Sequence, residues 1–464
     1  MRSTQKSTNF FKQGLCSLAI LLAVLLAFTA NAMGQTWFGQ NTTNLTNRGT
    51  SFTNTDTGTN NHARIEPNGT LTNSGGGRIA TIILNGGTLN NLNNAVITTA
   101  TLNSGGTINN AGAITNLTFS GGTYGGAGTV SNLTVNANAS FFDWGNLTTA
   151  TVNGWGELVN RTGRTIGTAT LNSGGLLDNR GTITNLIYNG GGYTGSGTIG
   201  NLTVNTNASG FNWGNLTTAT VNNNGILNNA TGRTIGTAVL NGGRLENMGR
   251  IDRLVYTGGT YRGIDGDLML WNGKITQYIR VGAGETIGEL QIGNGGHTDA
   301  FRGLIVNNNR VTFNHTNTLT HACAISGSGS LTKMGTGTLI LSGFNDYTGN
   351  TTISGGGLTV TGSLGNSFYY GAIENHGVLT FQNHYQRLSG NITGTGSLIH
   401  AGNDFLVLTG ENTHTGGTTV NSGAILQIGM GGATGSVAGN ITNNGQVIFF
   451  HNNNHTHSGI CQFS

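Results

Sequence analysis

The sequence predicts an all-β protein, a parallel β-solenoid with coils of about 17 residues. A block of about 69 residues occurs twice, so that Trp144 returns as Trp213 and Tyr124 as Tyr193, and a fading third copy begins at Tyr261. Inside each block a shorter unit recurs, whose polar marker falls at Asn103, Ser120, Asn136, Asn153, Asn172, Asn189, Asn205, Asn222 and Asn241. A period this short, without a helical pattern, is typical of a stack in which each coil buries its apolar side against its neighbours.

The composition supports the same fold class. Glycine accounts for 81 of 464 residues, proline for one, and charged residues for 8%. Segments such as 201–205 alternate apolar and polar residues, which predicts strands with Leu202 and Val204 pointing inward. Proline is rare because it cannot donate a hydrogen bond to an interior strand, and glycine and asparagine suit the corners. The side chains expected to stack in apolar columns are Leu171, Leu202, Val204, Val221 and Leu240.

The N-terminus predicts export. Residues 1–32 combine the basic residues Arg2, Lys6 and Lys12, an apolar run over 15–28 and a small-x-small cleavage site at 30–32. Removing them leaves 20 − 3 = 17 basic against 16 acidic residues, so the mature net charge is about +1 and gives no argument for nucleic-acid binding. No later apolar stretch is long enough for a transmembrane helix.

The two cysteines outside the signal peptide are not expected to pair. Cys323 and Cys461 are separated by roughly eight coils, which is on the order of 35–40 Å along a stack. A disulfide requires Cα atoms within about 7 Å. Cys16 lies at the start of the signal's apolar run, a position that does not fit a lipoprotein anchor.

The chain divides by its pattern into five segments. After the signal peptide, residues 33–80 are expected to hold an N-terminal cap and the first coils, and 81–262 the β-helix with repeats of about 69 residues. Residues 263–310 are richer in charge and predict an irregular junction. A second array occupies 311–464, where Phe313, Phe381 and Phe449 recur at equal spacings of about 68 residues. This spacing suggests four coils again, with the geometry of the first array.

Part of the second array resembles a known family. Residues 327–351, continuing through 357–360, are similar to the autotransporter-associated β-strand repeat, and a second copy starts at 394. The second copy departs from the first where His400, Asp404 and His414 replace Lys333, Gly337 and Tyr347. The resemblance implies a right-handed parallel β-helix, the passenger domain of an autotransporter, at a Gram-negative cell surface or secreted from it.

Autotransporters end in a membrane barrel, and the sequence has no region with the alternating strands of one. The expectation is therefore a truncated passenger, or an anchor encoded elsewhere. The implied partner is the outer-membrane secretion machinery or a missing C-terminal barrel.

Several residues are candidates for a functional site, each with a structural alternative. Asp265 and Asp267 share a face if they lie on a strand, and could pair or bind calcium; a solvated turn is the alternative. His455, His457 and Cys461 could ligate zinc, although histidines also recur in the repeat pattern at His315 and His321. The repeated aromatics Trp144, Trp213, Tyr124 and Tyr193 could stack on sugars or pack in the core. The prediction is that the chain has no catalytic, cofactor-binding or metal-binding residues and no cofactor.

The function expected from these features is that of an exported, non-catalytic passenger, an adhesin-like stalk whose partner is a host surface or a glycan. A polysaccharide-active β-helix enzyme, of the lyase or hydrolase type, is the alternative. The two hypotheses differ in one respect that a structure can show. An enzyme of this type requires carboxylates that converge in one groove.

Overall fold

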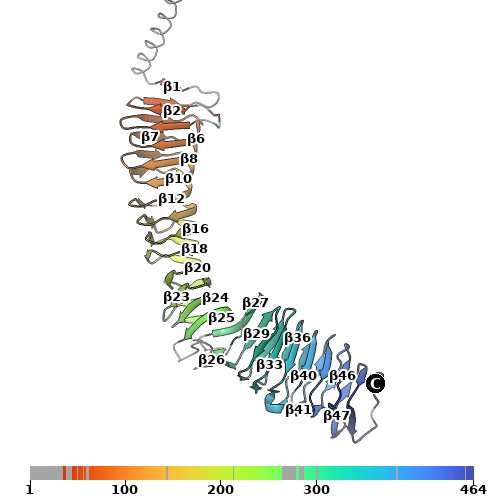
Figure 1. The fold of residues 1–464 in the computed structure, drawn as a ribbon. Coiled ribbons are helices and arrows are strands. Elements are labelled where there is room, and N and C mark those ends of the chain that lie inside the picture. Colours follow the sequence, from red (N-terminus) through yellow and green to blue (C-terminus); the bar gives the residue numbers. More distant parts are fainter. Residues whose placement is uncertain are drawn as a thin grey trace, which may run out of the picture. The chain divides into compact units, whose positions relative to one another are not determined.

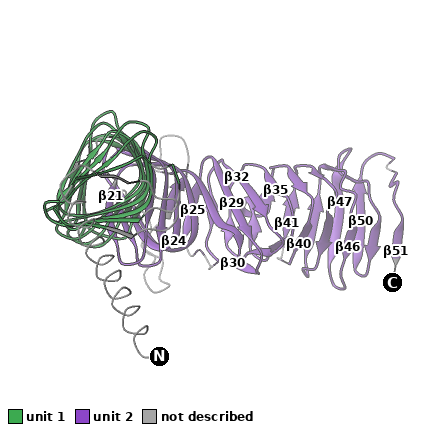
Figure 2. Ribbon diagram, turned by 90° about the horizontal axis from the view of Figure 1, so that it is seen from above, with its two compact units in different colours: residues 1–198 green, residues 199–464 purple. Residues whose placement is uncertain are grey.

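The computed structural model describes residues 35–37, 44–49, 51–55, 57–58, 62–142, 145–212, 214–263, 278–281, 287–298, 301, 303–382, 385–454 and 456–463. The described residues are almost entirely β-strand and turn, with one 3-10 helix, η1 (Gly365–Ser367). Contacts divide the chain into two compact units, 1–198 and 199–464, which Figure 2 colours separately. The predicted signal peptide lies outside the described residues. Within the described part of the chain, no helix is long and apolar enough to cross a membrane.

Each coil of unit 1 contains two strands, and Figure 1 shows these coils stacked one on the next. The strand position that is longer from β6 onward is here called the long strand and the other the short strand. The long strands are β2 (Asn44–Asn47), β4 (His62–Ile65), β6 (Arg78–Leu84), β8 (Val96–Asn103), β10 (Ala113–Ser120), β12 (Thr129–Val135), β14 (Leu147–Val152), β16 (Thr165–Leu171) and β18 (Thr182–Tyr188). The short strands are β1 (Gln35–Trp37), β3 (Ser51–Asn54), β5 (Thr70–Asn73), β7 (Thr88–Asn91), β9 (Thr107–Asn110), β11 (Thr123–Gly125), β13 (Ser140–Phe142), β15 (Glu157–Asn160), β17 (Leu176–Asn179) and β19 (Gly192–Thr194).

The register of the long strands gives the coil length. Ala100, Leu117, Leu133, Ala150, Ala169 and Leu186 lie opposite one another in consecutive coils, all in parallel pairs. The numbering of this column agrees with the predicted period of about 17 residues per coil in unit 1. The predicted β-solenoid is confirmed.

The first part of unit 2 keeps two strand positions per coil. Its strands are β20 (Thr198–Val204), β21 (Ser209–Asn212), β22 (Leu216–Asn222), β23 (Ile226–Asn229), β24 (Thr234–Asn247), β25 (Arg250–Gly263), β26 (Tyr278–Val281) and β27 (Ile287–Gly296). Val204, Val221 and Leu240 form a column in which each side chain is fully buried, and Leu202 lies opposite Ala219. Leu171 of unit 1 is also fully buried, so the five predicted inward positions are confirmed.

The remainder of unit 2 has three strand positions per coil, here called faces 1, 2 and 3. Face 1 contains β28 (Leu304–Asn307), β31 (Ile325–Ser326), β34 (Phe344–Asn345), β37 (Ser363–Leu364), β38 (Phe368–Tyr369), β41 (Gln386–Leu388), β44 (Phe405–Leu408), β47 (Ile425–Gly432) and β50 (Gln446–His451). Face 2 contains β29 (Arg310–His315), β32 (Ser330–Met334), β35 (Thr351–Ile353), β39 (Ile373–Asn375), β42 (Ile392–Thr393), β45 (Glu411–Asn412) and β48 (Ser436–Val437). Face 3 contains β30 (Leu319–His321), β33 (Thr338–Leu341), β36 (Gly357–Val360), β40 (Val378–Phe381), β43 (Ser397–His400), β46 (Thr418–Val420), β49 (Ile441–Asn443) and β51 (Cys461–Phe463).

The prediction that the second array repeats the geometry of the first is wrong. On face 3, Leu339 pairs with Leu358, Leu358 with Leu379 and Leu379 with Leu398, so each coil is longer than those of unit 1 because it has a third strand. A coil here takes about 20 residues, and a step of about 68 residues therefore covers three coils and one further strand. Phe313, Phe381 and Phe449 accordingly lie on faces 2, 3 and 1 and not in one column.

Cys323 and Cys461 are not joined by a disulfide, as their separation predicted. The five segments proposed from the sequence pattern remain predictions.

Candidate functional site

A ladder of buried asparagine side chains runs along the interior corner of unit 1. The amide Nδ2 of Asn54 donates to Oδ1 of Asn73 at 2.8 Å, Asn73 donates to Asn91 at 2.9 Å, and Asn91 donates to Asn110 at 2.8 Å. Each of these side chains is fully buried. Their Nδ2 groups also lie within reach of a backbone carbonyl further along the stack, as Asn54 does with the carbonyl of Arg78 at 3.2 Å. The ladder satisfies amides whose burial without partners would cost free energy.

The repeated tyrosines end these ladders. Asn110 donates to the hydroxyl of Tyr124 at 3.0 Å. The same arrangement returns twice, where Asn179 donates to Tyr193 and Asn247 donates to Tyr261, both at 2.9 Å. Tyr124 and Tyr193 lie in the short strands β11 and β19, which contain no asparagine, and Tyr261 lies near the end of the long strand β25. The long repeat seen in the sequence is therefore one asparagine ladder with its terminating tyrosine.

The marker residues predicted from the sequence form a second, outer ladder. Asn136 donates to Ser120, Asn153 to Asn136, Asn172 to Asn153 and Asn189 to Asn172, with distances of 2.8 to 3.0 Å. In unit 2, Asn222 donates to Asn205 at 2.8 Å. These side chains are half-buried, so water can replace part of their hydrogen bonding. Both ladders join consecutive coils to one another through side-chain hydrogen bonds.

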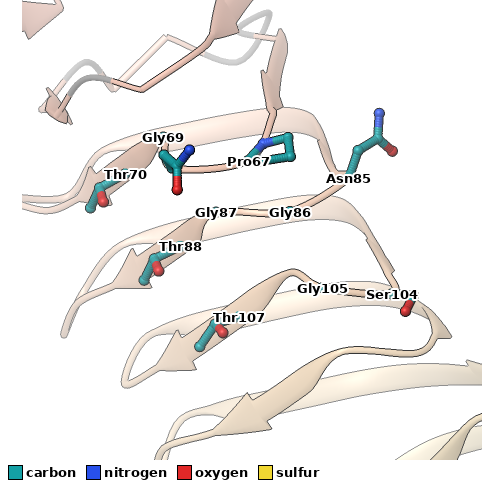
Figure 3. A pocket seen from close by; sticks show the side chains of 11 residues that line it. Pro67, Gly69, Thr70, Asn85, Gly86, Gly87, Thr88, Ser104, Gly105 and Thr107 are labelled. Atoms are coloured by element: carbon teal, nitrogen blue, oxygen red, sulfur yellow. The ribbon is translucent and has the colours of Figure 1, made fainter.

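A groove of about 520 Å³ crosses three coils of unit 1. Its lining residues are Pro67, Asn68, Gly69, Thr70, Asn85, Gly86, Gly87, Thr88, Ser104, Gly105 and Thr107. Figure 3 shows Thr70, Thr88 and Thr107 aligned in successive coils, with glycine corners beside them. Gly87 is required here, because its φ is 66° and an added Cβ would lie 2.4 Å from the carbonyl oxygen of Gly69.

The groove has the chemistry of a neutral polar surface. None of its lining residues is titratable. The nearest carboxylate in the sequence, Glu66, accepts hydrogen bonds from Arg64 at 2.5 Å and Asn85 at 3.2 Å, and the bond from Arg64 lowers its pKa. A single paired carboxylate does not supply the acid and base that glycoside cleavage needs. The sequence reasoning missed this groove, although the dipeptides 69–70, 87–88 and 106–107 repeat Gly-Thr once per coil.

The predicted alternatives for catalysis and metal binding receive no support from the described residues. Asp265 and Asp267 lie outside them, as does His455. Nδ1 of His457 lies 2.9 Å from the carbonyl of Val437. Among the residues that the structure describes, no group of three or more His, Cys, Asp or Glu side chains is placed to hold a metal ion.

The repeated aromatics divide into two cases. Trp144 and Trp213 lie outside the described residues. Tyr193 is buried, and the ring of Tyr124 lies 5.1 Å from the ring of Phe141. The packing interpretation is therefore confirmed for Tyr193, and burial raises its pKa to about 12.

The two repeat copies in unit 2 each contain one buried asparagine whose side chain links three coils. Oδ1 of Asn345 accepts from the amide of Ile325 at 3.0 Å, and its Nδ2 donates to the carbonyl of Ser363 at 3.1 Å. Asn412 accepts from the amide of Ile392 at 2.9 Å and donates to the carbonyl of Ser436 at 2.8 Å. The same repeat position thus performs the same role on face 1 and then on face 2.

The departures between the copies conserve burial and hydrogen bonding. The hydroxyl of Tyr347 lies 2.7 Å from Oγ1 of Thr351, and Nε2 of His414 lies 2.9 Å from Oγ1 of Thr418. Lys333 donates from Nζ to the carbonyls of Met334 and Gly335 at 2.6 and 3.0 Å. At the corresponding position, Nε2 of His400 donates to the carbonyl of Asp404 at 2.7 Å. In two of the three departures, Tyr347 to His414 and Lys333 to His400, the substituted side chain stays buried and keeps a hydrogen bond to a nearby group of the same kind.

Burial shifts the titration of several of these groups. Desolvation lowers the pKa of Lys333 to about 8. Desolvation lowers the pKa of His321 to about 4, although its ring nitrogen donates to the carbonyl of Phe301 at 3.0 Å. The pKa values of His315 and His414 are lowered for the same reason. These groups lie inside the stack as structural residues and do not form an assembled catalytic set.

Comparison with known proteins places the repeats in a family. Residues 331–360 and 398–428 match the passenger-associated-transport-repeat family. The resemblance to autotransporter passenger repeats, predicted from the sequence, is confirmed over these two segments. The chain is also similar to a protein of Brucella suis biovar 1 (strain 1330) named adhesin BmaC autotransporter, with 33% identity over 147 residues. The similar region is 27% of this chain and 4% of that protein, so the chain corresponds to a small part of its relative's length.

Proposed function

We propose that this chain is an exported passenger segment that acts as a non-catalytic, adhesin-like stalk. The observation that carries the proposal is the placement of two passenger-associated transport repeats inside the parallel coils of residues 303–382 and 385–454. Such a stack presents a long outer surface while its interior is filled by apolar columns and amide ladders. The similarity to a named adhesin supports the same role.

The proposal includes the route by which the chain leaves the cell. Residues 1–32 act as the signal peptide, and the outer-membrane secretion machinery delivers the chain to the cell surface or beyond. Coil-by-coil stacking suits passage through a pore, because each coil contacts only its neighbours and can fold as it emerges.

The alternative of a polysaccharide-active enzyme is less well supported. The described residues lack a cluster of three titratable ligands, and the groove of unit 1 is lined by neutral groups. A binding surface requires neither feature.

The test uses the mature chain, residues 33–464, immobilised on beads and presented to cultured host cells and to matrix components. Adhesion above that of beads carrying an unrelated β-solenoid supports the proposal. The same preparation is incubated with acidic and neutral polysaccharides, and the release of reducing or unsaturated ends is followed. Turnover of any of them, without adhesion, would favour the enzyme instead.

A further inference from the structure

Aromatic side chains gather on the outer side of face 1 in unit 2. Phe368 and Tyr370 are 47% and 71% exposed, and Tyr385 and Phe405 are partly exposed. All four belong to or adjoin three neighbouring strands, β38, β41 and β44. Exposed aromatic groups gathered in this way mark interaction sites more often than isolated ones do.

The register of the strands brings these rings together around Arg387. Phe368 lies directly opposite Arg387 in the next coil, and the rings of Phe368 and Tyr385 are 5.9 Å apart. Gln386 pairs with Leu406, which places the preceding residues, Tyr385 and Phe405, side by side in consecutive coils. We call Phe368, Tyr370, Tyr385, Arg387 and Phe405 the aromatic–arginine face.

Arg387 differs from the paired arginines of the chain. Arg180 and Arg250 each bind a carboxylate two positions away on the same stretch of chain, at 2.6 and 2.7 Å. Among the described residues, Arg387 has no ion-pair partner, and its Nε is buried without a hydrogen-bond acceptor. Because no described carboxylate pairs with it, the charge of this guanidinium is available to an acceptor that a ligand supplies.

Two hydroxyl groups lie near the end of the arginine's strand. Ser389 follows Leu388, the last residue of β41, and is two positions beyond Arg387. Its Oγ accepts a hydrogen bond from Oγ1 of Thr409 in the next coil at 3.2 Å. The face therefore combines aromatic rings, one uncompensated positive charge and polar groups, which is the combination that a charged sugar ring requires.

We propose that the aromatic–arginine face binds a saccharide that carries a carboxylate, such as a uronic or sialic acid residue of an acidic glycan. The planar guanidinium of Arg387 pairs with the carboxylate through two hydrogen bonds, a geometry that arginine favours. The apolar faces of the sugar rings lie against Phe368, Tyr385 and Phe405. The inference rests on the proposed adhesin-like function and names the class of its ligand.

The size of the face favours a glycan over a protein partner. Three coils separated by about 4.8 Å span only about 10 Å from first to last strand. A stable protein interface buries roughly 800 Å² on each partner. A face of this width accommodates two or three sugar rings.

The test measures binding of the mature chain to polygalacturonate and to sialyllactose by titration calorimetry. Matched neutral probes are carboxyl-reduced polygalacturonate and lactose. We expect binding of at least one acidic probe and none of its neutral counterpart. Arg387→Gln should weaken that binding by about 10- to 100-fold, the value of a hydrogen-bonded charge pair. Tyr385→Ala should weaken it as well, and Arg387→Lys should restore only part of the affinity.

Two control variants separate a local effect from a general one. Arg310→Gln removes an exposed arginine that lies 3.4 Å from Glu289, and Trp155→Ala removes a 78% exposed aromatic of unit 1; both should bind as the unmodified chain does. Hydrogen exchange over 363–410 confirms that the Arg387 variant remains folded. Equal binding of acidic and neutral probes, unchanged binding by the Arg387 variant, or no binding of any probe would overturn the inference. Adhesion to cells that survives in the Arg387 variant would overturn it while leaving the proposed function standing.

Discussion

Replacing Asn91 with alanine cuts the buried asparagine ladder near its middle. The change removes the donor to Oδ1 of Asn110 at 2.8 Å and the acceptor of Nδ2 of Asn73 at 2.9 Å. Asn73 then keeps only the long contact to the carbonyl of Val96 at 3.4 Å. Two buried polar groups are left without good partners, at about 1–3 kcal/mol each, so the free energy of unfolding of these coils should fall by about 2–6 kcal/mol.

Asn153→Ala is the matched control in the outer ladder. It also removes one donor and one acceptor, to Asn136 at 3.0 Å and from Asn172 at 2.8 Å. Because these side chains are half-buried, water replaces the lost bonds and the expected loss is about 1 kcal/mol.

Hydrogen exchange of the mature chain, read coil by coil with urea titration, measures both variants. Loss of protection in the Asn91 variant should be concentrated in strands β5, β7 and β9, because coils contact only their neighbours. Equal losses in the two variants would refute the argument, since burial would then make no difference to an amide ladder. A uniform loss across both units would refute the local, coil-by-coil account.

Three other changes test the core, the ladder end and a buried histidine. Leu202→Ala should lower the free energy of unfolding by roughly 2–4 kcal/mol because the cavity cannot collapse, and exchange protection should fall only in the neighbouring coils. An equal loss of protection over residues 85 to 450 would contradict a solenoid. Tyr193→Phe should lower the free energy of unfolding by about 1 kcal/mol, because it removes the hydroxyl that accepts the hydrogen bond of Asn179 at the end of the ladder. If the variant and the unmodified chain unfolded at the same urea concentration, that hydroxyl would have no role in stability. His321 stays neutral in the folded chain with a pKa of about 4, whereas in the unfolded chain its pKa is about 6.5. The unfolded state therefore binds the extra proton, and stability should fall by about 3 kcal/mol as the pH drops from 6.5 to 4. His321→Leu should reduce this dependence of stability on pH in unfolding titrations, whereas replacing an exposed histidine, as in His376→Gln, should not. The same pH dependence in the unmodified chain and in both variants would assign the effect to other groups.

The sequence predicted the features that depend on repetition alone. A polar marker that returns once per coil requires equivalent positions to stack, and Asn136, Asn153 and Asn172 do form a hydrogen-bonded column. Alternation within a strand likewise determines which side is buried, as for Val204 and Val221. These properties are local, because a side chain that follows the period of two must alternate between the two sides of its strand.

The sequence led to a wrong prediction of coil geometry in the second array, because the spacing of its repeat had two interpretations. A spacing of about 68 residues fits four coils of roughly 17 as well as three coils of roughly 20 and one further strand. Only the strand register distinguishes them, and it places Phe313 and Phe381 on different faces. Residue spacing gives the length of a repeat but not the number of corners at which the chain turns.

The sequence by itself determined that the chain stacks in parallel coils, which side chains point inward and which segments resemble passenger repeats. The tertiary structure decided which side chains contact one another in neighbouring coils. It joined Tyr193 to the amide of Asn179, and it gathered Phe368, Tyr385 and Phe405 around Arg387 although their unequal spacings along the chain form no regular pattern. The physical reason is that the register between neighbouring coils depends on the lengths of all the turns between their strands. One residue more or less at a corner therefore changes which side chains lie opposite one another.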